Sequence, residues 1–337
     1  MPDTVLLTGI SGFLGGHVAL ALLRAGYAVR GSLRDMGRAE AVRASLAGAG
    51  ADTARLDFVA LDLLSDAGWA RAMRGVRFLQ HTASPFVLSA PADPQELIAP
   101  ALEGTRRALA AALAADVERI VLTSSIAAIQ YGHADPTRLL SEADWTDPQS
   151  PHANAYARSK TLAEREAWTL MAAAGRRDAL AVLNPAVIFG PLLDDDPGTS
   201  PLLIRRLLGG RLPALPPLYL SCTDVRDVAA LHVAAMTDPT AGGTRCIVSE
   251  GAYCLPELAA MLRPAFPERR IPGWTLPLWL VRLAALFDAD LRANIAEIGA
   301  PRRLDSARAE ARLGRPLTPT AQAALATARS LVARGLI

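Results

Sequence analysis

Cysteine is scarce in this chain of 337 residues, and its scarcity argues against two classes of site. The three cysteines, Cys222, Cys246 and Cys254, are odd in number, and none forms a Cys-x-x-Cys pair. A disulfide framework needs paired cysteines, and a thiolate metal site needs closely spaced ones. We therefore expect no disulfide framework and no metal site, and the composition fits a reducing compartment.

Net charge and long apolar runs are also lacking. The chain has 35 Lys and Arg against 33 Asp and Glu, a net charge of +2, so no broad basic field predicts nucleic-acid binding. The most apolar late segment, 274–287, is broken by Pro277 and Arg282 and is too short to cross a membrane. The first expected strand starts close to Met1 and leaves no room for a signal peptide. We expect a soluble, cytoplasmic protein.

What the chain does contain is a glycine-rich stretch, Thr8–His17, between an apolar run and a helical pattern at 18–23. In a strand–turn–helix unit the first glycine allows a tight turn and the second lets the backbone approach a pyrophosphate. The third lets the helix pack closely on the strand. A turn that binds nothing remains the alternative. We predict a dinucleotide-binding turn whose contacts come from Gly9, Ser11, Gly12, Phe13 and Leu14.

The second expected strand, 27–33, ends without the acidic residue that would bond the ribose 2′-hydroxyl of NAD. Ser32 stands near that place, and Arg34 follows it. A guanidinium suits a 2′-phosphate because the two groups form charge-assisted hydrogen bonds. We therefore predict NADP(H) as the cofactor, with Arg38 as a second positive charge. The alternative is that Arg34 is a solvated loop residue beside Asp35, a helix cap.

The third expected strand, 56–61, runs into Asp62 and Leu63. A carboxylate at the carboxyl end of such a strand can accept a hydrogen bond from the adenine amino group, so we predict cofactor contacts here. Asp62 could instead be the N-cap of a helix at 67–73.

The fourth expected strand, 76–81, ends in small residues that would let the nicotinamide ribose approach the backbone. We interpret His81 as a packed, hydrogen-bonded side chain rather than an acid or base. The predicted cofactor contacts after this strand are Thr82, Ala83 and Ser84.

Strands and helices alternate along the chain and so predict an α/β fold with a doubly wound parallel sheet of the Rossmann type. Ligands bind beyond the carboxyl ends of the strands in such sheets, where the stretches above converge. The remaining elements expected are helices at 36–50, 94–114 and 153–174 and strands at 119–122 and 179–183, with a surface loop at 129–151.

Tyr156 and Lys160 lie one turn apart on the expected helix 153–174, so both face the same side. The ammonium can lower the pKa of the phenol and hold the ribose hydroxyls, while the phenol passes a proton to a carbonyl oxygen. Ser125, after the fifth strand, can supply a hydroxyl to the same oxygen. An ordinary amphipathic helix is the alternative, but the order of glycine turn, serine and Tyr-x-x-x-Lys makes chance a poor explanation.

These motifs resemble those of the extended short-chain dehydrogenases/reductases. Within that family they are similar to the dihydroflavonol-reductase and cinnamoyl-CoA-reductase-like branch, which includes microbial aldehyde and ketone reductases. The resemblance covers residues 1 to about 250. The stretches that carry it are Thr8–Gly15, Val29–Asp35, His81–Pro85, Thr123–Ser125, Tyr156–Glu164, Asn184–Pro185 and Gly190–Pro191.

The resemblance implies roles for residues at matching positions. It assigns catalysis to Ser125, Tyr156 and Lys160, and it prefers Ser125 to Ser124 because the second serine of this pair is the catalytic one in the family. Adjacent side chains on a strand point to opposite faces, so the two hydroxyls cannot both reach one carbonyl. It implies further cofactor contacts from Pro185, Val187 and Ser200. The substrate would be lined by Pro85, Phe86, Ser125, Ile126 and Tyr156.

One departure bears on the function. Pro100 stands where many extended reductases and epimerases keep an asparagine that orders a proton-relay water. This feature and Arg34 favour an NADPH-dependent carbonyl reductase over a sugar-nucleotide epimerase or dehydratase using tightly held NAD. A non-catalytic NADP-binding protein is the other alternative, and the intact Ser125, Tyr156 and Lys160 argue against it.

We expect residues 1–190, with 214–250 returning to them, to form the NADP-binding domain. The segments 191–213 and 251–337 would form a smaller, mostly helical substrate lobe. The run Asp194–Asp196 reads as a solvated turn rather than a metal site, because three consecutive acids cannot all face one ion. The partner is a small carbonyl or alcohol substrate. The oligomeric state is open, with a homodimer as one expectation.

Overall fold

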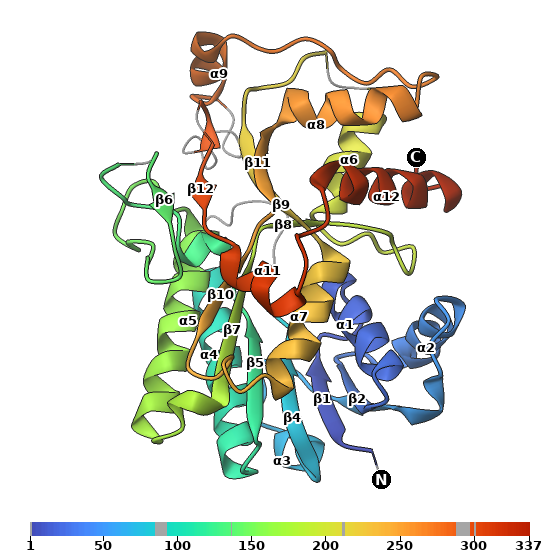
Figure 1. Cartoon of the computed structure of the whole chain (residues 1–337), viewed down its shortest axis with the longest axis vertical. Helices are drawn as coiled ribbons and strands as arrows, with labels where there is room; N and C mark the ends of the chain where they lie inside the picture. The colour runs from blue at the N-terminus through green and yellow to red at the C-terminus, as the bar shows by residue number, and fades with distance from the viewer. Residues whose placement is uncertain (1, 85–92, 136, 211–212, 288–296, 300) are drawn as a thin grey trace.

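The computed structural model describes residues 2–84, 93–135, 137–210, 213–287, 297–299 and 301–337. Within these ranges one sheet of seven parallel strands forms the base of the molecule (Figure 1). Its strand order is β10-β7-β5-β4-β1-β2-β3. The strands are β1 (Thr4–Thr8), β2 (Ala28–Leu33), β3 (Leu56–Ala60), β4 (Val76–His81), β5 (Arg119–Thr123), β7 (Leu180–Pro185) and β10 (Arg245–Val248).

Helices cover both faces of this sheet, which confirms the predicted doubly wound fold. The order reverses between β1 and β4, and that switch point is where such folds bind their ligand. One core packs the sheet against α1 (Phe13–Arg24), α2 (Ala39–Gly48), α7 (Val225–Thr237) and α11 (Ala307–Leu313). The other core packs it against α3 (Trp69–Ala72), α4 (Gln95–Ala114) and α5 (Ala155–Ala173).

A second layer lies above the carboxyl ends of the large sheet (Figure 1). It contains a three-stranded sheet of β8 (Val187–Phe189), β9 (Tyr219–Asp224) and β11 (Gly251–Cys254). Its core packs that sheet against α6 (Pro201–Leu208), α8 (Leu255–Leu262) and α12 (Thr320–Ala333), and α9 (Leu278–Ala284) lies near the top of the molecule. The lobe thus has a sheet as well as helices, and the domain boundaries at 190, 214 and 250 stay a prediction.

The segment 301–318 ties the end of the chain to the large sheet. Ala309 and Leu317 lie in the same core as α1 and α7. The buried carboxylate of Asp227 on α7 accepts hydrogen bonds from Arg315 at 2.5 Å and from the Thr318 backbone at 2.6 Å. The sequence analysis did not predict α11, because the helix buries one small residue and shows no apolar stripe.

The loop 129–151 is not simply a surface loop, as we had expected. It contains β6 (Leu139–Leu140), which pairs in parallel with β12 (Arg303–Leu304). Thr146 is fully buried, and Trp145 stacks under the guanidinium of Arg245, 3.8 Å from the ring centroid. Short 3-10 helices complete the fold at Met36–Arg38, Thr53–Arg55, Ile126–Ala128, Arg177–Ala179 and Arg263–Ala265.

In the described ranges, no helix has both the length and the apolar character needed to span a bilayer.

Candidate active site

The glycine turn joins β1 to α1 at the switch point of the sheet. Gly9 has a φ of +74°, and a Cβ there would come within 2.9 Å of the Ala83 backbone, so β1 and β4 end side by side. A Cβ on Gly15 would lie 2.0 Å from the Gly9 carbonyl oxygen. Only glycine therefore lets α1 pack this closely against the turn.

The beginning of α1 is suited to a diphosphate. Gly12 is the N-cap residue, no side chain caps this end, and the first turn carries no acidic residue. Gly12 is exposed, and the only atom near its would-be Cβ, other than those of its chain neighbours, is the Gly9 carbonyl oxygen at 3.4 Å. Free N–H groups and the positive end of the helix dipole favour an anion at such a place. Ser11, Phe13 and Leu14 are partly buried around the same turn.

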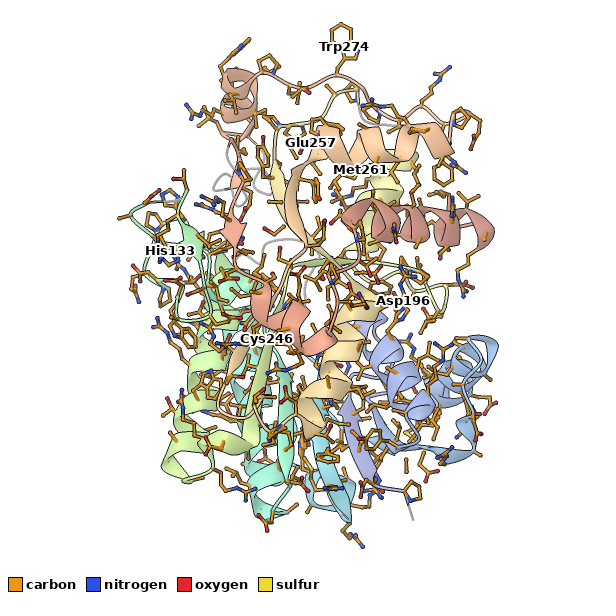
Figure 2. All side chains as sticks on the ribbon, viewed as in Figure 1. His133, Asp196, Cys246, Glu257, Met261 and Trp274 are labelled. Carbon is orange, nitrogen blue, oxygen red and sulfur yellow. The ribbon has the colours of Figure 1, made fainter. Side chains whose placement is uncertain are left out.

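Near the end of β2, Ser32 stands where NAD-binding sites of this kind have an acidic residue. The Gly9 backbone N–H donates a hydrogen bond to Ser32 Oγ at 3.4 Å. Arg34 is exposed, and no carboxylate in the described ranges pairs with it. Arg38 is 3.6 Å from a carboxylate oxygen of Asp196. Figure 2 shows Asp196 at the level where the lobe meets the N-terminal half of the sheet.

At the end of β3, the structure excludes the alternative role of Asp62, that of a helix N-cap. Asp62 does not cap a helix at 67–73, because α3 begins at Trp69 with Gly68 as its N-cap residue. The Asp62 carboxylate instead accepts a hydrogen bond from Leu64 N at 2.9 Å, and it is exposed at the strand end. Leu63 packs closely against Gly104 of α4.

The end of β4 is held against β1 by threonine side chains. Thr82 donates a hydrogen bond to the Thr8 carbonyl oxygen at 2.6 Å, and Ala83 N donates one to Thr8 Oγ1 at 3.2 Å. These contacts place Thr82, Ala83 and the following Ser84 beside the glycine turn. Pro85 and Phe86, predicted to contact substrate, lie outside the described residues.

His81 is packed inside the sheet, as the sequence analysis expected. Its Nδ1 lies 2.8 Å from Thr8 Oγ1. Burial, together with the charge of Lys160, lowers the pKa of His81 to about 4. The imidazole is therefore neutral near pH 7.

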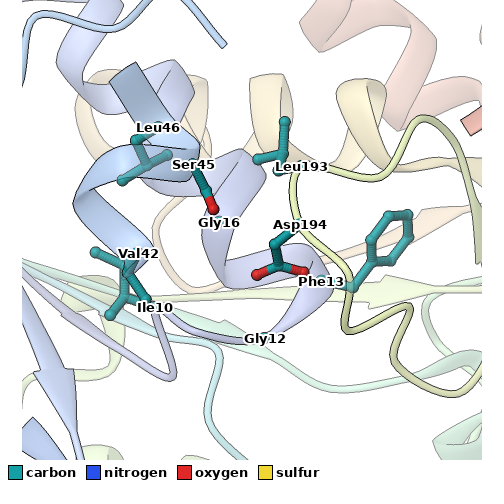
Figure 3. A pocket seen from close by; sticks show the side chains of 9 residues that line it. All are labelled: Ile10, Gly12, Phe13, Gly16, Val42, Ser45, Leu46, Leu193 and Asp194. Atoms are coloured by element: carbon teal, nitrogen blue, oxygen red, sulfur yellow. The ribbon is translucent and has the colours of Figure 1, made fainter. Parts of the chain in front are cut away.

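A loop after β8 covers one side of the glycine turn (Figure 3). Gly198 contacts Phe13, and a small pocket of about 20 Å³ remains between this loop, α1 and α2. That volume holds roughly one water. The carboxylates of Asp195 and Asp196 pair with different arginines, Arg334 and Arg38. Ser200 follows the loop as the N-cap residue of α6. The pocket is lined by Ile10, Gly12, Phe13, Gly16, Val42, Ser45, Leu46, Leu193 and Asp194.

Ser125, Tyr156 and Lys160 come together beyond the carboxyl end of β5. The side chains of Ser125 and Tyr156 are hydrogen-bonded to each other, and Ser125 Oγ accepts a further bond from Ala127 N at 3.1 Å. The Lys160 ammonium lies 5.8 Å from the centre of the Tyr156 ring. Ile126 is buried immediately after Ser125.

The electrostatics of these groups are set mainly by burial. Burial raises the pKa of the Tyr156 phenol, and the hydrogen bond with Ser125 acts in the opposite direction. Burial lowers the pKa of Lys160 to about 8, while the negative charge of Glu164 raises it. At neutral pH the site thus holds a protonated phenol next to a lysine that is still mostly charged.

The structure also brings in residues that the sequence analysis did not single out. Glu164, one turn after Lys160, is fully buried and paired with Arg245 of β10 at 2.5 Å. Asn184 of β7 joins the pair. Its neighbour Pro185, also buried, and the partly buried Val187 follow at the same edge of the sheet. The sequence did contain one signal that could have pointed to Glu164. It is a carboxylate four residues after Lys160, on the same face of the helix.

A family model of the NAD dependent epimerase/dehydratase family matches residues 5–249. The chain belongs to this family. Cinnamoyl-CoA reductase CAD2 of Medicago truncatula is one relative of this chain. The two are 33% identical over 276 residues, and the match covers 80% of this chain and 83% of that protein. Tetraketide alpha-pyrone reductase 2 of Arabidopsis thaliana is 34% identical over 269 residues, covering 78% and 83%.

The solved structure of the yeast methylglyoxal/isovaleraldehyde reductase Gre2 complexed with NADPH is similar to this structure over almost the whole chain. The TM-score is 0.80 at 26% identity, and the match covers 99% of this chain and 100% of that one. These findings confirm the extended short-chain dehydrogenase/reductase family and its cinnamoyl-CoA-reductase-like branch.

Proposed function

We propose that this protein is an NADPH-dependent carbonyl reductase that acts on an aldehyde or ketone, with Tyr156 as the proton donor. The observation that carries the proposal is the Ser125–Tyr156 hydrogen bond at the carboxyl edge of the sheet, the edge on which the glycine turn also lies. Lys160 stands beside the phenol. The similarity to reductases, one of them complexed with NADPH, supports the class of reaction and the cofactor.

The residues present fit this cofactor along the whole strand edge. The uncapped start of α1 would hold the diphosphate, and Arg34 with Arg38 would hold the 2′-phosphate. The exposed Asp62 carboxylate would accept a bond from the adenine. Leu63 would contact the cofactor beside Asp62, and Ser200 would contact it on the side of the 2′-phosphate. The nicotinamide half would pass the remaining strand ends, with contacts from Thr82, Ala83, Ser84, Pro185 and Val187.

Bound NADPH supplies the hydride that reaches the carbonyl carbon. The Tyr156 hydroxyl donates its proton to the carbonyl oxygen as negative charge develops there. The Ser125 hydroxyl, whose Oγ accepts a bond from Ala127 N, can turn its one hydrogen from the phenol to the same carbonyl oxygen. Lys160 would hold the ribose of the bound cofactor, and its positive charge would stabilise the phenolate that proton donation leaves behind.

The test of this function is NADPH consumption measured across aldehydes, β-keto esters and aryl ketones. A carbonyl reductase releases its nucleotide on dialysis and consumes one NADPH for each alcohol formed. Tightly retained NAD with no net oxidation would instead indicate an epimerase or dehydratase. NADPH binding without turnover of any carbonyl would indicate a non-catalytic binding protein.

The choice of NADPH over NADH is expected to depend on Arg34. Replacing Arg34 with Ala removes a charge-assisted bond with the 2′-phosphate, which costs about 1.5–3 kcal/mol. The KM for NADPH should therefore rise roughly 10- to 150-fold, while the KM for NADH stays nearly the same. The matched control is Arg329→Ala, which removes another exposed guanidinium, from α12. Wild-type protein that uses both nucleotides equally would contradict this role.

A further inference from the structure

We propose that Glu164 is a positioning residue of the proposed active site. Its buried carboxylate fixes α5 against the ends of β5 and β7 and supplies the negative charge that faces Lys160. The inference rests on the proposed function, because it concerns how that function's lysine and serine are held in place.

The Glu164 carboxylate is fully buried and accepts hydrogen bonds on both oxygens. Oε1 accepts from Arg245 Nε at 2.5 Å and from Trp168 Nε1 at 3.3 Å. Oε2 accepts from Ser124 Oγ at 2.5 Å and from Asn184 Nδ2 at 2.7 Å. These donors come from α5 itself, β7, β10 and the end of β5, so one carboxylate joins the helix to three strands of the sheet.

Two of these donors lead directly to Ser125. Ser124 is its chain neighbour, and its side chain points to the carboxylate rather than to the phenol. Asn184 Nδ2, besides bonding Glu164, donates to the Ser125 carbonyl oxygen at 3.1 Å. Hydrogen bonds therefore hold the backbone on both sides of the Ser125 Cα in a fixed position relative to Glu164. Ser124 has this structural role, while Ser125 bonds the phenol.

Lys160 lies one helical turn before Glu164, on the same side of α5. The other groups that face the ammonium are His81 of β4, which is neutral, and the ring of Tyr156. Glu164 is the group whose charge raises the pKa of Lys160 against the effect of burial. Without that charge the lysine would lose its proton at lower pH.

Packing alone does not explain a charge at this position. A buried ion pair is generally no more stabilising than an apolar pair of similar volume, because both ions must be desolvated. The arrangement here adds two things that an apolar pair lacks. One is a negative charge one turn from the lysine of the proposed active site, and the other is a hydrogen-bonded link to Ser125.

The experiment compares the pH dependence of NADPH affinity and of kcat/KM in wild type, Glu164→Gln and Glu166→Gln. Glu166 is the matched control because it lies on the same helix but pairs with Arg106 of α4 at 2.7 Å. In the wild type, cofactor affinity and activity should fall as Lys160 loses its proton near pH 8. In Glu164→Gln this fall should begin about one pH unit lower. At pH values above the wild-type midpoint, NADPH affinity and kcat/KM should then be about tenfold lower than in the wild type. Glu166→Gln should match the wild type.

Glu164→Gln leaves Arg245 without a counter-charge and could fail to fold. The second variant, Glu164→Gln with Arg245→Met, removes both charges and should show the same direction of shift. The inference is overturned if a folded variant that lacks the carboxylate loses NADPH affinity and kcat/KM from the same pH as the wild type. If the wild type binds NADPH but reduces no carbonyl, the proposed function fails, and the pH dependence of binding still decides the role of Glu164.

Discussion

Tyr156→Phe should bind NADPH as tightly as the wild type and lose about 10²–10⁴-fold in turnover. The change removes one hydroxyl from a helix whose other contacts remain, so the cofactor cradle around the glycine turn is untouched. The lost group is the one that, in the proposed mechanism, delivers a proton to the carbonyl oxygen. The measurement is kcat from NADPH absorbance together with Kd from NADPH fluorescence.

The control for this variant is Tyr27→Phe. Tyr27 directly precedes β2 and so lies at the amino end of that strand, away from the proposed active site. It packs edge-on against Phe78, with the ring centroids 6.1 Å apart. Turnover of this variant should be unchanged. Lys160→Ala should weaken both NADPH binding and turnover. A Tyr156→Phe protein within about threefold of wild-type turnover would remove Tyr156 from the mechanism. His81 would then be tested next.

Gly15→Ala should destabilise the fold and abolish NADPH binding, the largest stability effect that we expect from one methyl group. A Cβ at this position would lie 2.0 Å from the Gly9 carbonyl oxygen. Because that atom belongs to the backbone, α1 must move away from the turn as a unit. Overpacking typically costs about 1–3 kcal/mol, and a backbone contact this short places the substitution at the upper end of that range. The Tm should fall by roughly 6–12 °C, measured by thermal unfolding.

The matched substitution is Gly48→Ala, at the last position of α2. A Cβ there has no other atom within 4 Å, and Gly48 is exposed. Helix propensity predicts a gain of up to about 1 kcal/mol at such a site. Equal thermal stability of the Gly15 and Gly48 variants would show that α1 tolerates displacement, and the glycine turn would then need another explanation.

The parts of the site that could be predicted from sequence are those determined over a few neighbouring residues. The glycine turn is local, and so is the spacing that puts Tyr156 and Lys160 on one side of a helix. Strand ends could be placed because the carboxyl ends of parallel strands meet at one edge. Ser125 needed the family resemblance, since strand alternation alone does not say which of two serines faces the phenol.

The parts that could not be predicted depend on residues far apart in the chain. Glu164 and Arg245 are separated by 81 positions, and nothing near either one indicates its partner. The pairing of Leu139–Leu140 with Arg303–Leu304 joins two runs of two residues, too short for any periodicity. The alternative role of Asp62 as the N-cap of a helix at 67–73 is wrong, because the helix begins only at Trp69 and Gly68 is the residue that precedes it.

The attachment of the 301–318 segment has a consequence for how the protein is made. Ala309 and Leu317 complete the core that contains α1 and α7, and Arg315 supplies the counter-charge of the buried Asp227. A nascent chain that has just finished β10 already holds every strand of the large sheet but leaves this carboxylate and one apolar face exposed to water. Folding of the N-terminal half should therefore be completed only after residue 318 has left the ribosome, and until then the growing chain is a substrate for chaperones.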